Sequence, residues 1–262
     1  MAVRRVVFRR IRTRDDARIV DDYSPTWGQR SLEFIRGTKP RYFIRDGRLV
    51  LCRAIENRKY VLRYASEKIA ALGVRSFVEV GSGNGINILV LALLHPEIER
   101  LRGIELTENG VNAAKKMLTD PPIPELVYLT GLSAETVSER LRGRDISFEQ
   151  GDMRKLPWED ESFDLVFSWV AFEQLPYSYL TAFREACRVS RRYVLFVESF
   201  REAQRNIFQR LNLANLDYFR SSYREVLGAG FRLVSFEPLA ISKIKYTNGA
   251  LLGEREFRPD RP

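Results

Sequence analysis

The stretch FVEVGSGNG, Phe77 to Gly85, decides the fold of this chain. Its first half is strand-like, and its second half places glycine at every second position, Gly81, Gly83 and Gly85. Because glycine has no Cβ, such a turn between a strand and a helix lets the backbone approach a ligand closely. Ile86 stands where the dinucleotide-binding pattern G-x-G-x-x-G requires its third glycine. The turn is therefore predicted to hold a nucleoside-like ligand without a pyrophosphate.

Two further segments follow at distances that suit a nucleoside. Glu105 ends a short strand-like run, and an acidic side chain there can accept hydrogen bonds from both hydroxyls of a ribose. In the segment GDMRKLPWEDESFDLVFS, residues 151–168, Asp152 is placed to accept from an exocyclic amino group such as that of adenine. We expect Leu106 and Met153 to lie on either side of the base.

Together these segments resemble the class I S-adenosylmethionine-dependent methyltransferases, most closely the branch with the methyltransferase 11 type domain. The resemblance covers residues 60–198, about half of the chain. It implies S-adenosylmethionine as the cofactor and S-adenosylhomocysteine as its product. In such enzymes the acidic residue of the first motif, here Glu79, lies near the methionine amino group. With the strand ends, the predicted cofactor-binding residues are Glu79, Gly81, Ser82, Gly83, Gly85, Glu105, Leu106, Asp152, Met153 and Ser168.

The segment after the fourth strand departs from the family. Many relatives carry Leu-Glu-His there, but Phe172-Glu173-Gln174 stands in this chain, so no histidine can shuttle a proton. The sulfonium is already an activated methyl donor, so the protein mainly has to align a nucleophile with the methyl carbon. An alcohol acceptor would also gain roughly 10²–10⁴-fold from a general base. The catalytic candidates are Glu173 and Glu198 at two strand ends, and either could equally be a substrate-binding clamp.

Several acceptors lack their usual residues. Methylation of a DNA-base amino group usually uses Asn/Asp-Pro-Pro-Tyr/Phe after the fourth strand, where this chain has Ser168-Trp169-Val170-Ala171. Methylation of pyrimidine C5 needs a cysteine nucleophile at a tip of the core strands, but Cys52 lies in the appendage and Cys187 within an expected helix. The leading hypothesis is therefore methyl transfer to an O or N atom of a small molecule or glycan. The alternatives are an RNA methyltransferase whose basic N-terminal arm contacts phosphates, and a cofactor-binding partner protein without catalysis.

The alternation of strands and helices predicts an α/β, Rossmann-like, doubly wound fold with a mostly parallel seven-stranded sheet. Residues 231–236 and 239–246 are expected to form its antiparallel C-terminal edge. The expected organisation is a basic N-terminal appendage at 1–59, a methyltransferase core at 60–254 and a frayed tail at 255–262.

Charge is concentrated in the appendage. Residues 1–60 hold 16 of the 43 Lys and Arg but only 7 of the 34 Asp and Glu, which accounts for the whole formal net charge of +9. This basic arm could simply be solvated, or it could contact an anionic substrate, RNA or a partner subunit. Asp46-Gly47 predicts a tight hairpin over residues 42–52. The nearby aromatic residues could form a lid over the substrate or pack the appendage onto the core.

Composition sets the remaining expectations. With 262 residues and 45% hydrophobic residues the chain can bury a full core. No apolar run reaches the roughly 18 residues of a membrane span, and the first residues do not resemble a signal peptide, so we expect a cytoplasmic protein. The two cysteines form no metal-binding or disulfide pattern, and His95 is interpreted as a helix-terminal residue. No metal is expected.

Overall fold

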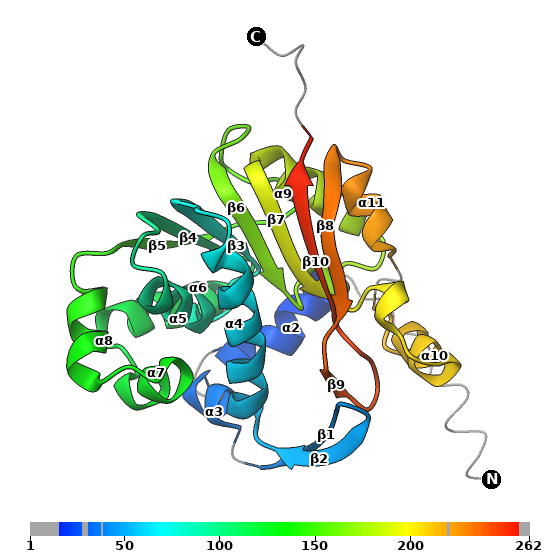
Figure 1. Cartoon of the computed structure of the whole chain (residues 1–262), viewed down its shortest axis with the longest axis horizontal. Coiled ribbons are helices and arrows are strands. Elements are labelled where there is room, and N and C mark those ends of the chain that lie inside the picture. The colour runs from blue at the N-terminus through cyan, green and yellow to red at the C-terminus, as the bar shows by residue number, and fades with distance from the viewer. Residues whose placement is uncertain (1–15, 28–30, 38, 219–220, 257–262) are drawn as a thin grey trace.

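The computed structural model describes residues 16–27, 31–37, 39–218 and 221–256 (Figure 1). At its centre lies a seven-stranded sheet with the order β5-β4-β3-β6-β7-β10-β8. Strands β3 to β7 pair in parallel, and β10 is antiparallel to both of its neighbours. The strands are β3 (Ser76–Val80), β4 (Arg100–Glu105), β5 (Asp145–Gln150), β6 (Phe163–Trp169), β7 (Ser190–Glu198), β8 (Phe231–Pro238) and β10 (Gly249–Arg255). The predicted Rossmann-like fold class is confirmed.

Helices cover both faces of this sheet. Since successive residues of a strand point to opposite faces, Phe77 of β3 belongs to one hydrophobic core and Val78 to the other. The first core also includes side chains of α4 (Ala54–Ala70), α5 (Ile86–Leu94), α6 (Glu108–Thr119), α7 (Ile123–Thr130) and α8 (Ala134–Leu141). The second includes those of α9 (Tyr179–Val189) and α11 (Tyr223–Leu227). Buried β3 therefore ends between two packed layers, which fixes the position of the glycine turn that follows it.

Some helices differ from the sequence expectation. Helix α4 begins at Ala54 rather than Tyr60, because its polar first turn is capped by a hydrogen bond from the Arg53 amide to Glu56. Helix α7 was not expected: its proline-rich first turn suits a helix start, and Gly131 ends it in the left-handed conformation. The sequence pattern predicts one helix over residues 201–213, but the structure has two elements there, η2 (Arg201–Ala203) and α10 (Ile207–Asn215). Helices α2 (Asp16–Trp27) and α3 (Ser31–Arg36) were not expected either.

The prediction for the last strands was wrong. Residues 239–246 were expected to pair with residues 231–236 of β8. Instead they contribute the short strand β9 (Ile241–Lys243), which pairs with β1 in a separate sheet. The neighbour of β8 is β10, a strand that the sequence did not reveal. Strand β10 begins with Gly249 and contains Gly253, so its local β-propensity is low. Burial between β7 and β8 forms this strand, since Ala250 and Leu251 are fully buried.

The N-terminal segment is folded against the core. It contains α2 (Asp16–Trp27), α3 (Ser31–Arg36) and the expected hairpin, in which β1 (Arg41–Arg45) pairs with β2 (Arg48–Cys52). With β9 the hairpin forms a three-stranded sheet beyond the carboxyl ends of the central strands, at the bottom of Figure 1. The expected boundary at residue 60 falls inside α4, and β10 extends to Arg255. The arginines of residues 1–15, and residues 257–262 of the expected frayed tail at 255–262, lie outside the described residues.

Across the described ranges, every helix is too short or too polar to cross a membrane.

Candidate functional site

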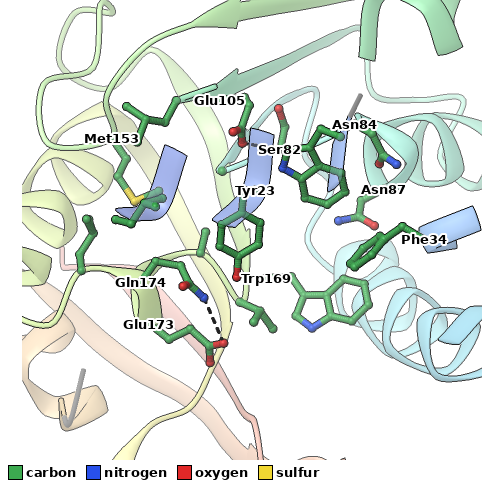
Figure 2. A pocket seen from close by; sticks show the side chains of 18 of the residues that line it. Tyr23, Phe34, Ser82, Asn84, Asn87, Glu105, Met153, Trp169, Glu173 and Gln174 are labelled. Atoms are coloured by element: carbon green, nitrogen blue, oxygen red, sulfur yellow. Dashed lines mark hydrogen bonds between the residues drawn. The ribbon is translucent and has the colours of Figure 1, made fainter. Parts of the chain in front are cut away.

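One cavity, with a volume of about 340 Å³, lies at the carboxyl ends of the parallel strands. In Figure 2, Ser82 and Glu105 lie on one side of it and Glu173 and Gln174 on another, with Tyr23 between them. This position follows from the topology, because the loops after β3 and β6 leave the sheet in opposite directions and open a crevice between them. Parallel α/β sheets bind their ligands at this kind of crevice.

The glycine turn forms one wall of the cavity. It is tied to β4 by the Gly81 and Ser82 amides, which donate to the Ile104 carbonyl at 2.9 and 3.0 Å. Gly83 has a φ of +53°, and a Cβ at this position would come within 2.9 Å of the Trp27 ring. The backbone at Gly83 can therefore be approached closely only because it has no side chain.

Gly85 serves a different purpose. It starts α5 in the left-handed conformation with a φ of +76°, and it does not line the cavity. A Cβ there would come within 2.6 Å of the Phe148 ring and 2.9 Å of Ala114. The third glycine is thus required by packing between the turn, β5 and α6, rather than by a ligand.

Glu105 lines the cavity where β4 ends, and both of its carboxylate oxygens are held. Its Oε2 accepts from the Gly83 amide at 3.0 Å, and its Oε1 accepts from the Thr107 amide at 3.0 Å and the Thr107 hydroxyl at 2.7 Å. Each oxygen keeps lone-pair capacity, because a carboxylate has about four acceptor sites. These bonds fix the carboxylate beside the glycine turn, the position that a ribose diol would require.

Asp152, Met153 and Leu106 also line the cavity. Arg154 orients the Asp152 carboxylate, since the Arg154 amide donates at 2.8 Å and its Nε at 2.9 Å to the same oxygen. Burial alone would raise the pKa of Asp152, but the hydrogen bonds from Arg154 outweigh it and lower the pKa. Asp152 is therefore a fixed anionic acceptor beside two apolar side chains, as an adenine site requires.

Glu79 does not reach the cavity itself. It is fully buried, and its Oε1 accepts from Asn87 Nδ2 at 2.7 Å. Burial raises its pKa to about 8, against the opposing effects of Asn87 and Arg58. Arg58 donates to Asn87 Oδ1, its guanidinium lies 4.9 Å from the centre of the Trp169 ring, and desolvation lowers its pKa to about 10. Asn87 and Arg58 do line the cavity, so Glu79 acts on it through them.

Ser168 and Glu198 lie behind the cavity wall rather than in it. Glu198 is fully buried, and its Oε1 accepts from Ser168 Oγ at 2.7 Å and the Ala171 amide at 3.0 Å. Its Oε2 accepts from the Glu173 amide at 3.2 Å. Burial, followed by the neighbouring Glu173 charge, raises the pKa of Glu198 to about 8. This corrects the expected direct roles of both residues: Glu198 and Ser168 hold the loop after β6.

Glu173, the other catalytic candidate, lines the cavity within the short helix η1 (Phe172–Gln174). The Tyr246 hydroxyl donates to its Oε1 at 3.4 Å, and Lys243 Nζ donates to the Tyr246 oxygen. Burial, and then the Glu173 charge, raises the pKa of Tyr246 well above its usual value. The Lys243 side chain remains solvent-accessible, yet surrounding protein desolvates it enough to lower its pKa. These hydrogen bonds connect Glu173 to Lys243 of β9, and so to the three-stranded sheet β2-β1-β9, called the small sheet below.

A family model described as a methyltransferase domain matches residues 78–197, the part of the chain that carries the glycine turn, Glu105 and Asp152. This part of the chain is a class I S-adenosylmethionine-dependent methyltransferase domain. No curated protein sequence matches the chain.

Solved structures with a similar fold are distant in sequence. The [4+2]-cyclase SpnF is 14% identical, with a TM-score of 0.63 over 94% of this chain and 98% of that one. The magnesium protoporphyrin IX methyltransferase of Synechocystis PCC 6803, with bound S-adenosylhomocysteine, is 13% identical, with a TM-score of 0.55 over 77% and 84%. A putative methyltransferase in complex with the Haloferax volcanii Trm112 activator is 16% identical, with a TM-score of 0.53 over 79% and 93%. At these identities the likeness shows the fold of the methyltransferase domain.

The N-terminal segment adds aromatic side chains to the cavity of the methyltransferase domain. Tyr23 and Trp27 from α2 and Phe34 from α3 line it, and the Trp27 and Phe34 rings meet edge to face with centroids 4.9 Å apart. Phe43 of β1 is 5% exposed and also lines it, whereas Tyr42 is 60% exposed. Most of these aromatic residues therefore border the candidate ligand space. No motif in the sequence indicated this, because aromatic residues that pack a core look the same.

Proposed function

We propose that this protein is an S-adenosylmethionine-dependent methyltransferase acting on an O or N atom of a small-molecule or glycan acceptor. One observation carries the proposal: a single cavity is bordered by the glycine turn, Glu105 and Asp152 on one side and by Glu173 and Tyr246 on another. A cofactor and an acceptor could therefore meet in one enclosed space, as in-line transfer requires.

The cavity residues fit the parts of the cofactor. In this proposal Glu105 accepts from the ribose hydroxyls, and Asp152 accepts from the adenine amino group between Leu106 and Met153. The methionine end lies along Gly81 and Gly83, which both line the cavity. Asn87 and Arg58, which the sequence did not single out, supply donors near that end, with Glu79 behind them.

The protein's own share of the chemistry is positioning and proton handling. S-adenosylmethionine supplies an activated methyl group when it is bound. Glu173 borders the cavity and is the proposed acceptor of the proton that an attacking hydroxyl loses. Glu198 does not touch the reactants, but through its hydrogen bonds to the backbone of the loop it keeps Glu173 at the cavity. Aromatic side chains from α2 and α3 keep water away from this space.

The test uses calorimetry with S-adenosylhomocysteine. Glu105→Ala removes a charged hydrogen-bonding group, and about 1.5–3 kcal/mol per bond corresponds to a loss of roughly tenfold or more in affinity. The matched control is Glu149→Ala, on the neighbouring strand β5, where the side chain is exposed and away from the cavity. This control should bind like the parent protein.

Two outcomes would count against the proposal. If the parent protein does not bind S-adenosylhomocysteine, S-adenosylmethionine is excluded as its cofactor. If Glu105→Ala binds S-adenosylhomocysteine with unchanged affinity, Glu105 is excluded from the cofactor site. A parent protein that binds the cofactor but transfers no methyl group to any acceptor class would favour the non-catalytic alternative. Tight RNA binding that weakens steeply with salt, with a log–log slope of about −0.7 per phosphate contacted, would favour an RNA acceptor.

A further inference from the structure

The end of the cavity away from the glycine turn is bordered by one face of the small sheet. Phe43 of β1 pairs with Lys243 of β9, and cross-strand partners point to the same face. Arg41 lies two residues before Phe43 along β1 and so shares that face. All three residues line the cavity. Two cationic side chains, one from each strand, therefore border this end of the cavity on either side of a buried aromatic ring.

These two cations have no anionic partner within the described part of the chain. Neither Arg41 nor Lys243 has a carboxylate within ion-pair distance there, and the one hydrogen bond that Lys243 donates goes to the Tyr246 hydroxyl. By contrast, Arg154 at the same cavity pairs with Asp152, and Arg102 pairs with Asp145 on the outside of the sheet. Two like charges that border a cavity without an ion-pair partner are complementary to an anionic ligand.

Charged side chains are arranged differently at the two ends of the cavity. At the cofactor end the lining carboxylates are Glu105 and Asp152, which can accept hydrogen bonds from hydroxyl and amino groups of a ligand. At the small-sheet end Glu173 is the lining carboxylate, and it is hydrogen-bonded to Tyr246 and Gln174. Arg41 and Lys243 are exposed and Glu173 is fully buried, so an anion that entered this end from solvent would meet the two cations first. The cationic pair is therefore placed to orient an acceptor and not the cofactor.

The space between this pair and Glu173 is bordered by flat rings. Tyr246, hydrogen-bonded to Glu173, lies edge-on to Tyr218 with ring centroids 5.8 Å apart, and Trp169 lines another part of the same cavity. Planar apolar ligands gain most from such walls, because aromatic faces bury large flat areas and pack with defined geometry. A guanidinium also fits a carboxylate better than it fits a neutral group, since it can form two parallel hydrogen bonds.

We propose that the acceptor is an aromatic carboxylic acid whose carboxylate is bound between Arg41 and Lys243 and whose hydroxyl group lies beside Glu173. This rests on the proposed function and names the substrate class of the same site. In the transfer the acceptor oxygen forms its bond to the methyl carbon as the carbon–sulfur bond breaks. The bonding pair stays on sulfur, and the hydroxyl proton passes to Glu173.

The experiment measures binding to the protein saturated with S-adenosylhomocysteine, so it does not depend on turnover. The probes are 4-hydroxybenzoate and 4-hydroxycinnamate, each compared with its uncharged methyl ester by calorimetry. The acids should bind at least about tenfold more tightly than their esters, because loss of charge-assisted hydrogen bonds has that effect. Arg41→Gln and Lys243→Gln should each lower the affinity for the acids by a similar factor and leave the affinity for the esters unchanged.

The controls separate this inference from the proposed function. Affinity for S-adenosylhomocysteine should stay within about twofold in both variants, because neither residue lies at the cofactor end. Arg48→Gln is the matched control, since Arg48 is exposed on the neighbouring strand β2 and away from the cavity. If the cofactor product binds but the acids bind no better than their esters, or do not bind at millimolar concentration, the aromatic acid is excluded while the proposed function stands. Unchanged acid binding in both variants would exclude the cationic pair.

Discussion

The two ends of the cavity are built in different ways. The cofactor end comes from three short segments, each of which begins where a strand of the central sheet ends, at Gly81, Glu105 and Asp152. The acceptor end is assembled from α2, β1, β9 and the loop that carries Tyr246, which lie far apart along the chain. The first end can be recognised as a motif, and the second exists only in the folded chain. This difference predicts that substitutions at the first end act on cofactor binding and those at the second on the acceptor.

The largest expected effect is at the glycine turn. Gly83→Val should abolish binding of S-adenosylhomocysteine, because a side chain there would occupy ligand space and contact Trp27. Calorimetry measures the loss, and circular dichroism checks that the variant is folded. Gly143→Ala is the control for backbone strain alone: its φ is +71°, and a Cβ there would meet nothing within 4 Å. If Gly83→Val is folded and binds S-adenosylhomocysteine with normal affinity, the turn has only a structural role. The distinction between the two ends of the cavity would then be wrong.

The second prediction concerns Glu173 and Glu198, which were equivalent catalytic candidates in the sequence. Glu198→Ala would leave several buried donors without an acceptor, among them Ser168 Oγ and the Ala171 amide, so it should lower the free energy of unfolding by about 3 kcal/mol. Glu173→Gln should leave stability intact, because it removes a like charge beside Glu198, while methyl transfer falls by roughly 10²-fold or more. Urea denaturation and a turnover assay measure the two quantities. The reverse pattern would exchange the proposed roles.

The smallest effect concerns pH at the cofactor end. The pKa of Glu79 is about 8 in the folded protein, against an ordinary value near 4.5, so the folded state binds more protons than the unfolded chain between these values. Stability should therefore fall as pH rises through this window. Glu79→Gln has no such titration and can still accept from Asn87, so its stability relative to the parent should increase from pH 5 to pH 8. A difference that stays constant over this range would show that Glu79 is ionised throughout.

The cofactor end could be predicted from sequence because strand ends and ligand-binding residues coincide there. Gly81, Gly83, Glu105 and Asp152 all line the cavity, as the motif spacing indicated. The motif does not say which way a side chain points. Gly85 was needed for packing, because its neighbour Phe148 comes from a strand that the local sequence does not include.

The acceptor end could not be predicted because its residues have no local signature. The same is true of Arg58 at the cofactor end: it lies among polar residues of α4 that look like a solvated helix face, and only its contacts with Asn87 and Trp169 place it in the cavity. Lys243 was expected in an edge strand of the central sheet; its actual partner, β1, lies some 200 residues earlier in the chain. For Glu198 the strand end was correct, but hydrogen bonds to the loop after β6 turn it away from the cavity.

The pairing of β1 with β9 also has a consequence for synthesis of the protein. A ribosome releases β1 early, but its partner β9 follows only after most of the central sheet has been made. Until then the inner edge of β1 presents unpaired backbone groups, which is the kind of edge that invites association with other chains. The methyltransferase domain can begin to fold while Phe43 still lacks Lys243 opposite it. The proposed acceptor end would then be complete only after β9 has emerged, later than the glycine turn at the proposed cofactor end.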